Sequence, residues 1–156
     1  MSRLIDQIKF HDGEVKAENG NHKVYKDHLG FYTVGWGHLI LETDPENNLE
    51  VGDEVSEERV VELFENDLEI CKKEIRNNLD FFDDLDEIRQ RCIIDLTFNM
   101  GMPRLKKFVK TLDHLKNGRY DEAGDELLDS RYAKQVGKRA ERIADMIKTG
   151  LDSEDF

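Results

Sequence analysis

Glycine is concentrated in one stretch of the chain, and this concentration limits what the chain can fold into. Six of the 11 glycines fall between Gly13 and Gly52. Glycine disfavours helices and allows tight turns, while β-branched and aromatic residues such as Val24, Tyr25 and Trp36 occupy the intervals. We therefore predict a small antiparallel sheet with loops over residues 12–56.

The rest of the chain has helical periodicity. Ser2 is a plausible N-cap for a short amphipathic helix over residues 2–11. Ser56 and the two acids after it favour a helix start, and apolar residues then recur every three or four positions, which predicts a long helix over residues 57–78. Later apolar stripes run from Ile88 to Gly101, Leu105 to Gly118, Tyr120 to Leu128 and Ala140 to Gly150. These patterns predict one α+β domain, mainly helical, with five or six helices.

Several classes of protein are excluded by length and composition. The chain has 156 residues and no apolar run long enough for a membrane span. No secretory signal is readable at the start, so we expect an intracellular chain. Cys71 and Cys92 lack metal-ligand spacing, so we expect reduced core thiols and no metal or other cofactor. We expect residues 151–156 to form a frayed acidic tail.

The charge is unevenly distributed. Net charge is −12, and residues 41–90 hold 18 acidic and 5 basic residues. This balance argues against nucleic-acid binding and stable membrane association. Clusters of basic residues in the last third are typical of solvated helix faces.

Four polar residues near the predicted sheet are candidates for chemistry. We expect the ligand site in a cleft between the sheet region and the helices. Asp12 ends the first helix, where the helix dipole disfavours an acid, and Asp27 precedes a turn. Thr33 and His38 have ordinary structural interpretations as a strand residue and a buried histidine. Their order and spacing carry more information than any one of them.

Residues 23–38, KVYKDHLGFYTVGWGH, match every defined position of the pattern Y-x-D-x-x-G-x-x-T-x-G-x-G-H. This pattern resembles the phage-type lysozymes, or endolysins (glycoside hydrolase family 24). The resemblance extends over nearly the whole chain, with further matches at Leu63-Phe64, Asp67, Phe98 to Gly101, Ser130 to Tyr132, Gln135 and Arg139-Ala140.

The resemblance implies a lysozyme-like bilobed fold. Its sheet lobe is residues 12–56, its connecting helix residues 57–78, and its helical lobe residues 1–11 and 79–150. It also implies hydrolysis of the β-1,4 bond between N-acetylmuramic acid and N-acetylglucosamine in peptidoglycan. We expect a monomer that lyses host cells, is held in the host cytoplasm before release, and acts at the wall.

Matching the family residue by residue implies roles for individual side chains. Asp12 stands at the position of the general acid, Asp27 at that of the second carboxylate, and Thr33 at that of the site threonine. The substrate-binding positions fall on Tyr32, Asn99, Gln135 and Arg139, and Arg139 also matches an arginine that contacts the acid. A buried structural pair falls on His38 and Asp67.

Glycoside hydrolysis needs these two carboxyls in different protonation states. One must donate a proton to the leaving oxygen, and the other must activate water or stabilise positive charge. A carboxyl at a helix C-terminus is biased toward its neutral form, whereas one in a solvated turn stays ionised. The family is associated with inversion, with Asp27 as base.

Two departures from the family concern the acid. The position holds Asp rather than Glu, and residues 14–22 form an insertion of about six residues. Three alternatives remain: Asp12 is the acid, Glu14 or Glu18 replaces it, or there is no competent acid. The function classes that follow are a muramidase, a weak or inactive peptidoglycan-binding module, and a transglycosylase that leaves an anhydro-sugar.

Overall fold

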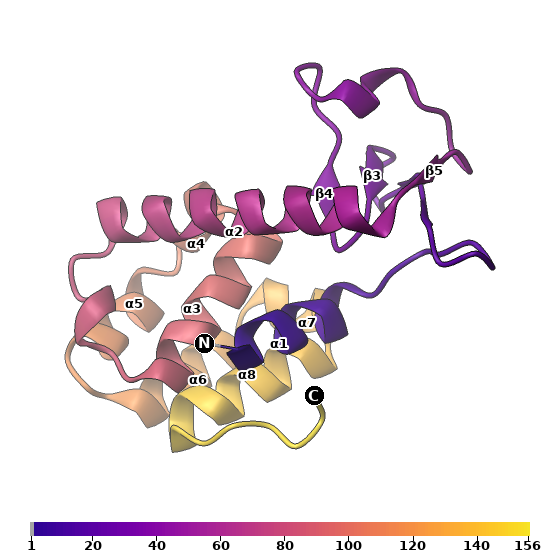
Figure 1. The fold of residues 1–156 in the computed structure, drawn as a ribbon. Helices are drawn as coiled ribbons and strands as arrows, with labels where there is room; N and C mark the ends of the chain where they lie inside the picture. Colours follow the sequence, from indigo (N-terminus) through magenta and orange to yellow (C-terminus); the bar gives the residue numbers. More distant parts are fainter. Residues whose placement is uncertain (1) are drawn as a thin grey trace. The chain divides into compact units, whose positions relative to one another are not determined.

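The computed structural model describes residues 2–156, without the side chain of Ser2. Its contacts divide the chain into two units, which are described separately. The smaller unit is Ile8–Ile70, and the larger combines the start of the chain through Gln7 with Cys71–Phe156. Helices α1 (Ser2–Asp12) and α2 (Glu57–Asn78) each contribute residues to both units (Figure 1).

The smaller unit contains the predicted antiparallel strands. Strands β2 (Tyr25–Lys26), β3 (Tyr32–Val34) and β4 (His38–Leu39) form one sheet, and β1 (His22–Lys23) pairs with β5 (Glu54–Val55). The register places Thr33 opposite both Tyr25 and Leu39. A 3₁₀ helix, Pro45–Asn48, lies in the loop between β4 and β5. The small sheet predicted over residues 12–56 is therefore confirmed.

The turn between β3 and β4 depends on Gly35. This glycine has φ +68°, and a Cβ added to it would lie 2.4 Å from a methyl carbon of Val60 on α2. Such a distance is shorter than van der Waals contact, so only glycine fits there. The turn thus packs directly on the first part of α2.

Helices make up the larger unit. Helix α6 packs against α5 and α8, and α3 also packs against α8. Cys92 is buried in this unit with Ile93, Ile94 and Leu96. Burial raises the pKa of its thiol, as expected for a core cysteine. The helices are α3 (Glu87–Met100), α4 (Met102–Leu105), α5 (Val109–Lys116), α6 (Tyr120–Leu128), α7 (Arg131–Val136) and α8 (Lys138–Thr149), with a 3₁₀ helix at Phe82–Asp84.

Two expectations about the larger unit are wrong. The apolar stripe from Leu105 to Leu115 is interrupted, because Phe108 leaves helical geometry at ψ 58° and packs its ring edge-on against Tyr132. The tail is also not frayed, because Asp152 binds Arg91 and Arg3 and Asp155 binds Arg142. These are long-range contacts that a local sequence pattern does not reveal.

The predicted fold class, α+β and mainly helical, is confirmed. Helix α2 has the bounds predicted from its apolar spacing, and the Ser56 hydroxyl accepts the Arg59 N–H at 3.2 Å. Within residues 2–156, no helix combines the length and hydropathy that crossing a membrane requires.

Candidate active site

Asp27 lies in the turn between β2 and β3, and the backbone orients its carboxylate. Its Oδ1 accepts the N–H groups of Leu29 and Phe31, both at 2.9 Å. Asp27 also closes the turn through its own backbone N–H, which donates to the carbonyl of Phe31. Its Oδ2 accepts no hydrogen bond from the described part of the chain. The turn therefore fixes one oxygen and leaves the other for a water molecule or a ligand.

Asp12 is the last residue of α1, and its carboxyl lies against the turn between β3 and β4. Its carboxyl carbon is 3.6 Å from the position that a Cβ on Gly37 would occupy. Burial raises the pKa of Tyr25, and the negative charges of Asp12 and Asp27 raise it further, while a hydrogen bond with the backbone of Gly37 opposes them. Both acids therefore act on the same tyrosine.

Thr33 and Tyr32 are neighbours on β3 with different surroundings. Thr33 is 3% exposed and lies opposite Tyr25, with its hydroxyl donating to the carbonyl of Phe31 at 3.0 Å. Tyr32 points to the other face of the sheet, because successive side chains on a strand alternate. Its hydroxyl lies 3.4 Å from Glu50. The structure thus brings Thr33, and not Tyr32, toward Tyr25.

His38 begins β4 and contacts two carboxylates. Its Nδ1 lies 2.7 Å from Asp67 on α2, the partner expected from the resemblance. Its Nε2 lies 2.8 Å from Asp44, a residue the sequence did not single out. Burial of the ring favours its neutral form, but the bonds to Asp67 and Asp44 outweigh burial and raise the pKa of His38. The ring therefore ties α2 to the loop after β4 through Asp67 and Asp44.

We expect the variant Asp44→Asn to be destabilised by about 1.5–3 kcal/mol at about pH 5, where His38 is charged in both proteins. A raised pKa stabilises the folded state below the unfolded pKa, and this contribution disappears as the pH rises through the folded pKa. The difference in unfolding free energy, measured by urea denaturation, should therefore shrink by about pH 9. An equal difference at both pH values contradicts this assignment.

The predicted substrate-binding residues of the larger unit lie on α3, α7 and α8. Asn99 is exposed near the end of α3, and its Oδ1 accepts the Tyr132 hydroxyl at 2.8 Å. Gln135 is exposed on α7. Arg139, on α8, forms an ion pair with Asp95, whose side chain is completely buried. The Asn99 amide and the Arg139 guanidinium are therefore each held by a neighbouring side chain.

A buried polar chain extends from Arg139 to the C-terminal segment. Asp95 accepts the Gln7 amide at 2.8 Å, and Gln7 in turn accepts the Nε–H of Arg91 at 3.0 Å. The other two nitrogens of Arg91 bind both carboxylate oxygens of Asp152. We did not predict Gln7, Asp95 or Arg91 as part of this site. The sequence feature that could have indicated this chain is Asp95, an acid within an apolar helical stretch. A buried acid must be paired, so its position predicts a partner.

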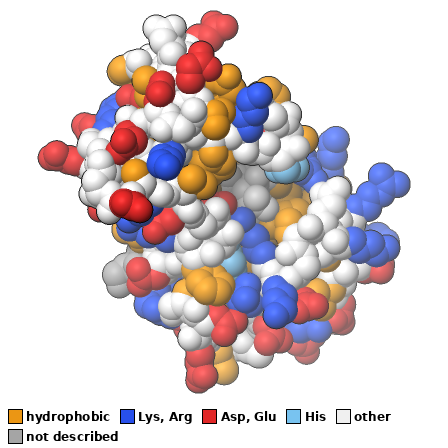
Figure 2. All heavy atoms as spheres, turned by 90° about the vertical axis from the view of Figure 1, so that its right-hand side faces the viewer, with side chains coloured by type: hydrophobic (Ala, Val, Ile, Leu, Met, Phe, Trp, Pro, Cys, Tyr) orange, Lys and Arg blue, Asp and Glu red, His pale blue; other side chains and the backbone are white. Residues whose placement is uncertain are grey.

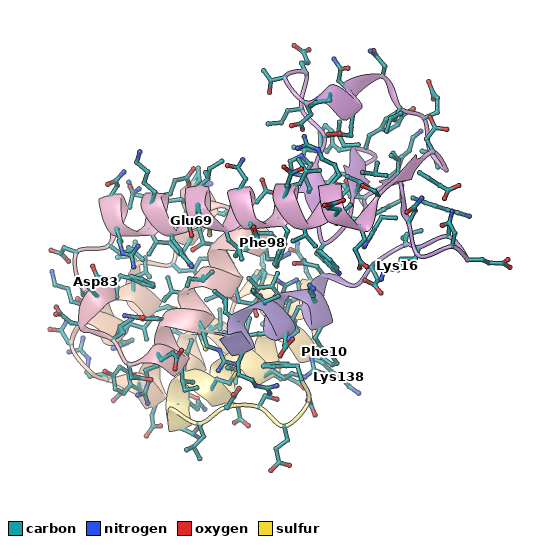
Figure 3. All side chains as sticks on the ribbon, viewed as in Figure 1. Phe10, Lys16, Glu69, Asp83, Phe98 and Lys138 are labelled. Carbon is teal, nitrogen blue, oxygen red and sulfur yellow. The ribbon has the colours of Figure 1, made fainter. Side chains whose placement is uncertain are left out.

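The inserted segment, residues 14–22, is anchored to the smaller unit. Lys16, labelled in Figure 3 on the segment after α1, donates to Glu57 at 3.0 Å. Asn19 and Asn21 donate to Glu54 on β5. The carboxylate of Glu14 accepts the indole N–H of Trp36 at 3.0 Å. Glu18 lies exposed in a turn closed by Gly20 and Ala17 and has no hydrogen bond among the described residues.

No group of three or more His, Cys, Asp or Glu side chains within the described residues could hold a metal ion. The smaller unit instead has two acids, Asp12 and Asp27, and the Thr33 hydroxyl near Tyr25. Most glycoside hydrolases cleave the glycosidic bond with a pair of Asp or Glu side chains. The smaller unit has two such acids near Tyr25, so the site points to the glycoside hydrolase class.

Comparison with known proteins agrees with this class. A family model described as Phage lysozyme matches residues 15–146. Probable T4-type lysozymes 1 and 2 of Dictyostelium discoideum are 31% and 30% identical, and each match covers 96% of this chain and 96% of the relative. Peptidoglycan hydrolase gp36 of Enterobacteria phage SP6 is 25% identical, over 86% of this chain and 16% of that protein. The chain therefore belongs to the phage lysozyme family and is a glycoside hydrolase.

Proposed function

We propose that this enzyme is a muramidase that hydrolyses the β-1,4 bond between N-acetylmuramic acid and N-acetylglucosamine in peptidoglycan. It acts at the bacterial cell wall and serves host-cell lysis. The observation that carries the proposal is the presence of Asp12 and Asp27 near one tyrosine, with an Asp27 oxygen left open. The name of the phage SP6 relative supports peptidoglycan as the substrate.

In this mechanism the two carboxyls have complementary roles. The protonated Asp12 carboxyl donates its proton to the glycosidic oxygen as the bond to the anomeric carbon breaks. Asp27 Oδ2 accepts a proton from the water that attacks the anomeric carbon from the opposite face. The Thr33 hydroxyl donates to Phe31, so its oxygen lone pairs remain able to accept a hydrogen bond from that water.

Glu14 and Glu18 are weaker candidates for the acid. Glu14 accepts the Trp36 indole N–H, and the Lys16 ammonium lies 3.6 Å from its other oxygen, so both of its oxygens already contact neighbouring side chains. Glu18 lies in an exposed turn, and its carboxylate makes no hydrogen bond among the described residues that would orient it toward Asp27. We therefore assign the proton donor to Asp12.

The remaining predicted residues act on the sugar chain in this proposal. The Asn99 amide and Gln135 are hydrogen-bonding groups for the N-acetyl sugars, and Tyr32 offers an aromatic ring. Arg139 supplies positive charge toward the anionic glycan. The His38–Asp67 contact is structural, and it keeps α2 attached to the sheet that carries Asp27 and Thr33.

Purified peptidoglycan distinguishes the proposed enzyme from a binding module with the same fold. We expect the protein to clear a peptidoglycan suspension and to release soluble muropeptides. A protein that sediments with peptidoglycan without clearing it would be a binding module instead. This alternative is favoured by one observation, the shorter Asp side chain at the position where the family has Glu.

The acidic residues lead to a second prediction about activity. The net charge of −12 repels an anionic wall, and the acidic excess lies in residues 41–90, which include α2. The face drawn in Figure 2 exposes both acidic and basic side chains. The Debye length falls from about 30 Å at 0.01 M salt to about 8 Å at 0.15 M, so salt should reduce this repulsion.

We therefore expect the initial rate of wall lysis to rise with NaCl over this range. Replacing two exposed acids of α2, Glu58 and Glu65, with lysine should flatten the dependence. A rate that falls steadily with NaCl in the unmodified protein contradicts the electrostatic explanation.

A further inference from the structure

The indole of Trp36 contacts residues on both sides of Asp12. Before Asp12 in the chain, the Lys9 ammonium lies 4.0 Å from the centroid of the Trp36 ring. After Asp12, Glu14 accepts the Trp36 Nε1–H at 3.0 Å. A cation over an aromatic face and a hydrogen bond to a carboxylate are both attractive contacts. One side chain therefore holds the end of α1 and the start of the inserted segment.

Trp36 is itself fixed in place. It is 3% exposed, and its ring packs edge-on against Phe64 of α2 at 5.3 Å and against His22 of the insertion at 5.0 Å. Burial lowers the pKa of His22, so this ring is neutral at pH 7. Rigid neighbours on two elements keep the indole from following Glu14 if the inserted segment moves.

The residue after Trp36 lies beside Asp12. A Cβ added to Gly37 would be 3.6 Å from the Asp12 carboxyl carbon, so the carboxyl occupies the space that a side chain at position 37 would enter. Residues 36 and 37 thus meet the segment from Lys9 to Glu14 at three points. These contacts fix the position of Asp12 relative to the turn between β3 and β4.

We propose that Trp36 and Glu14 are positioning residues that hold the Asp12 carboxyl in place against Gly37. The inference rests on the proposed function, since it assigns Asp12 as the proton donor. An Asp side chain is one methylene shorter than Glu, so its backbone must be placed more accurately to reach a glycosidic oxygen. A displacement of about 1 Å can cost about 10² in rate. The insertion that begins at Glu14 supplies this placement.

Glu14 provides the clean test, because its side chain is exposed and its removal leaves no cavity. We expect Glu14→Ala to lower kcat on soluble peptidoglycan fragments about tenfold, with KM changed less than about twofold. Glu14→Gln keeps an oxygen that accepts the Trp36 N–H, so it should restore most of the activity. Trp36→Phe should resemble Glu14→Ala, and the double variant should be no worse than the more impaired single variant.

Glu57, the first residue of α2, offers a matched control because it binds Lys16 of the same inserted segment. Its side chain is 51% exposed, compared with 41% for Glu14, and it accepts a 3.0 Å bond from Lys16. Glu57→Ala loosens the insertion without touching Trp36, so kcat should stay unchanged. The proposal is overturned if Glu14→Ala retains the original kcat, or if Glu57→Ala lowers kcat equally. It is also overturned if Glu14→Gln is as impaired as Glu14→Ala, because Glu14 would then transfer a proton itself.

A measurement without substrate separates this proposal from the proposed function. The carbon-13 chemical shift of the Asp12 carboxyl, followed by NMR, should move in Glu14→Ala and Trp36→Phe and stay constant in Glu57→Ala. If the original protein does not cleave peptidoglycan, the proposed function fails, and this shift still decides whether Trp36 and Glu14 position Asp12. An unchanged Asp12 shift in both variants overturns the positioning role.

Discussion

Replacing Asp27 with asparagine is expected to reduce the rate of peptidoglycan hydrolysis about 10²- to 10⁴-fold, the range contributed by a general base. The asparagine Oδ1 can still accept the N–H groups of Leu29 and Phe31, so the turn should keep its geometry. What is lost is the charged oxygen that takes a proton from water. The measurement is kcat on purified peptidoglycan, with the thermal unfolding midpoint as a check on folding.

Asp53 provides the matched control for Asp27. It is another turn carboxylate of the smaller unit, and its Oδ2 accepts the N–H of Glu50 at 2.8 Å. We expect Asp53→Asn to keep full activity. If Asp27→Asn also keeps full activity while remaining folded, Asp27 is not the base.

The second large effect concerns stability. We expect Asp152→Asn to lower the free energy of unfolding by about 2–4 kcal/mol, because Arg91 is only 2% exposed and would lose its anionic partner. Asp152 is 33% exposed, so solvent screening keeps the effect below that of a fully buried pair. Urea denaturation at pH 7 measures the difference.

The stability difference between Asp152→Asn and the original protein should depend on pH in a specific way. The hydrogen bond from Arg91 lowers the pKa of Asp152 from 3.8 to about 2. A lowered pKa contributes stability above the unfolded value, and this contribution is lost as the pH falls through about 2. The difference between Asp152→Asn and the original protein should therefore be constant between about pH 5 and 7.

Asp155→Asn is the control for the tail. Its ion pair with Arg142 is more exposed, so its loss should cost no more than about 1 kcal/mol. Equal effects of Asp152→Asn and Asp155→Asn would mean that the buried Arg91 does not depend on its carboxylate partner.

Sequence patterns predicted those parts of the fold that depend on interactions between residues close together in the chain. The apolar spacing of α2 and its Ser56 cap predicted a helix with the observed bounds. The glycines and β-branched residues between Gly13 and Val55 predicted a small sheet, because they specify turns and strands over short distances. Placing Asp12 at the end of α1 also required only local information.

Contacts between distant residues were not predictable in this way. Asp44 joins His38, and Asp152 joins Arg91 across 61 positions of sequence, through pairings that no spacing specifies. The bond from Trp36 to Glu14 likewise depends on how the inserted segment folds back on the sheet. Phe108 interrupts a predicted helical stripe, and its ring packs on Tyr132. In each case tertiary contacts, rather than local preference, decided the structure.

The most direct test of the central claim follows the oxygen atom of water. Peptidoglycan is digested in oxygen-18 water, and the released muropeptides are reduced at once and examined by mass spectrometry, with finished fragments incubated in the same water as the exchange control. Hydrolysis by Asp12 and Asp27 predicts one labelled oxygen at each new muramic acid end. Unlabelled 1,6-anhydro ends, or intact glycan strands, would contradict it.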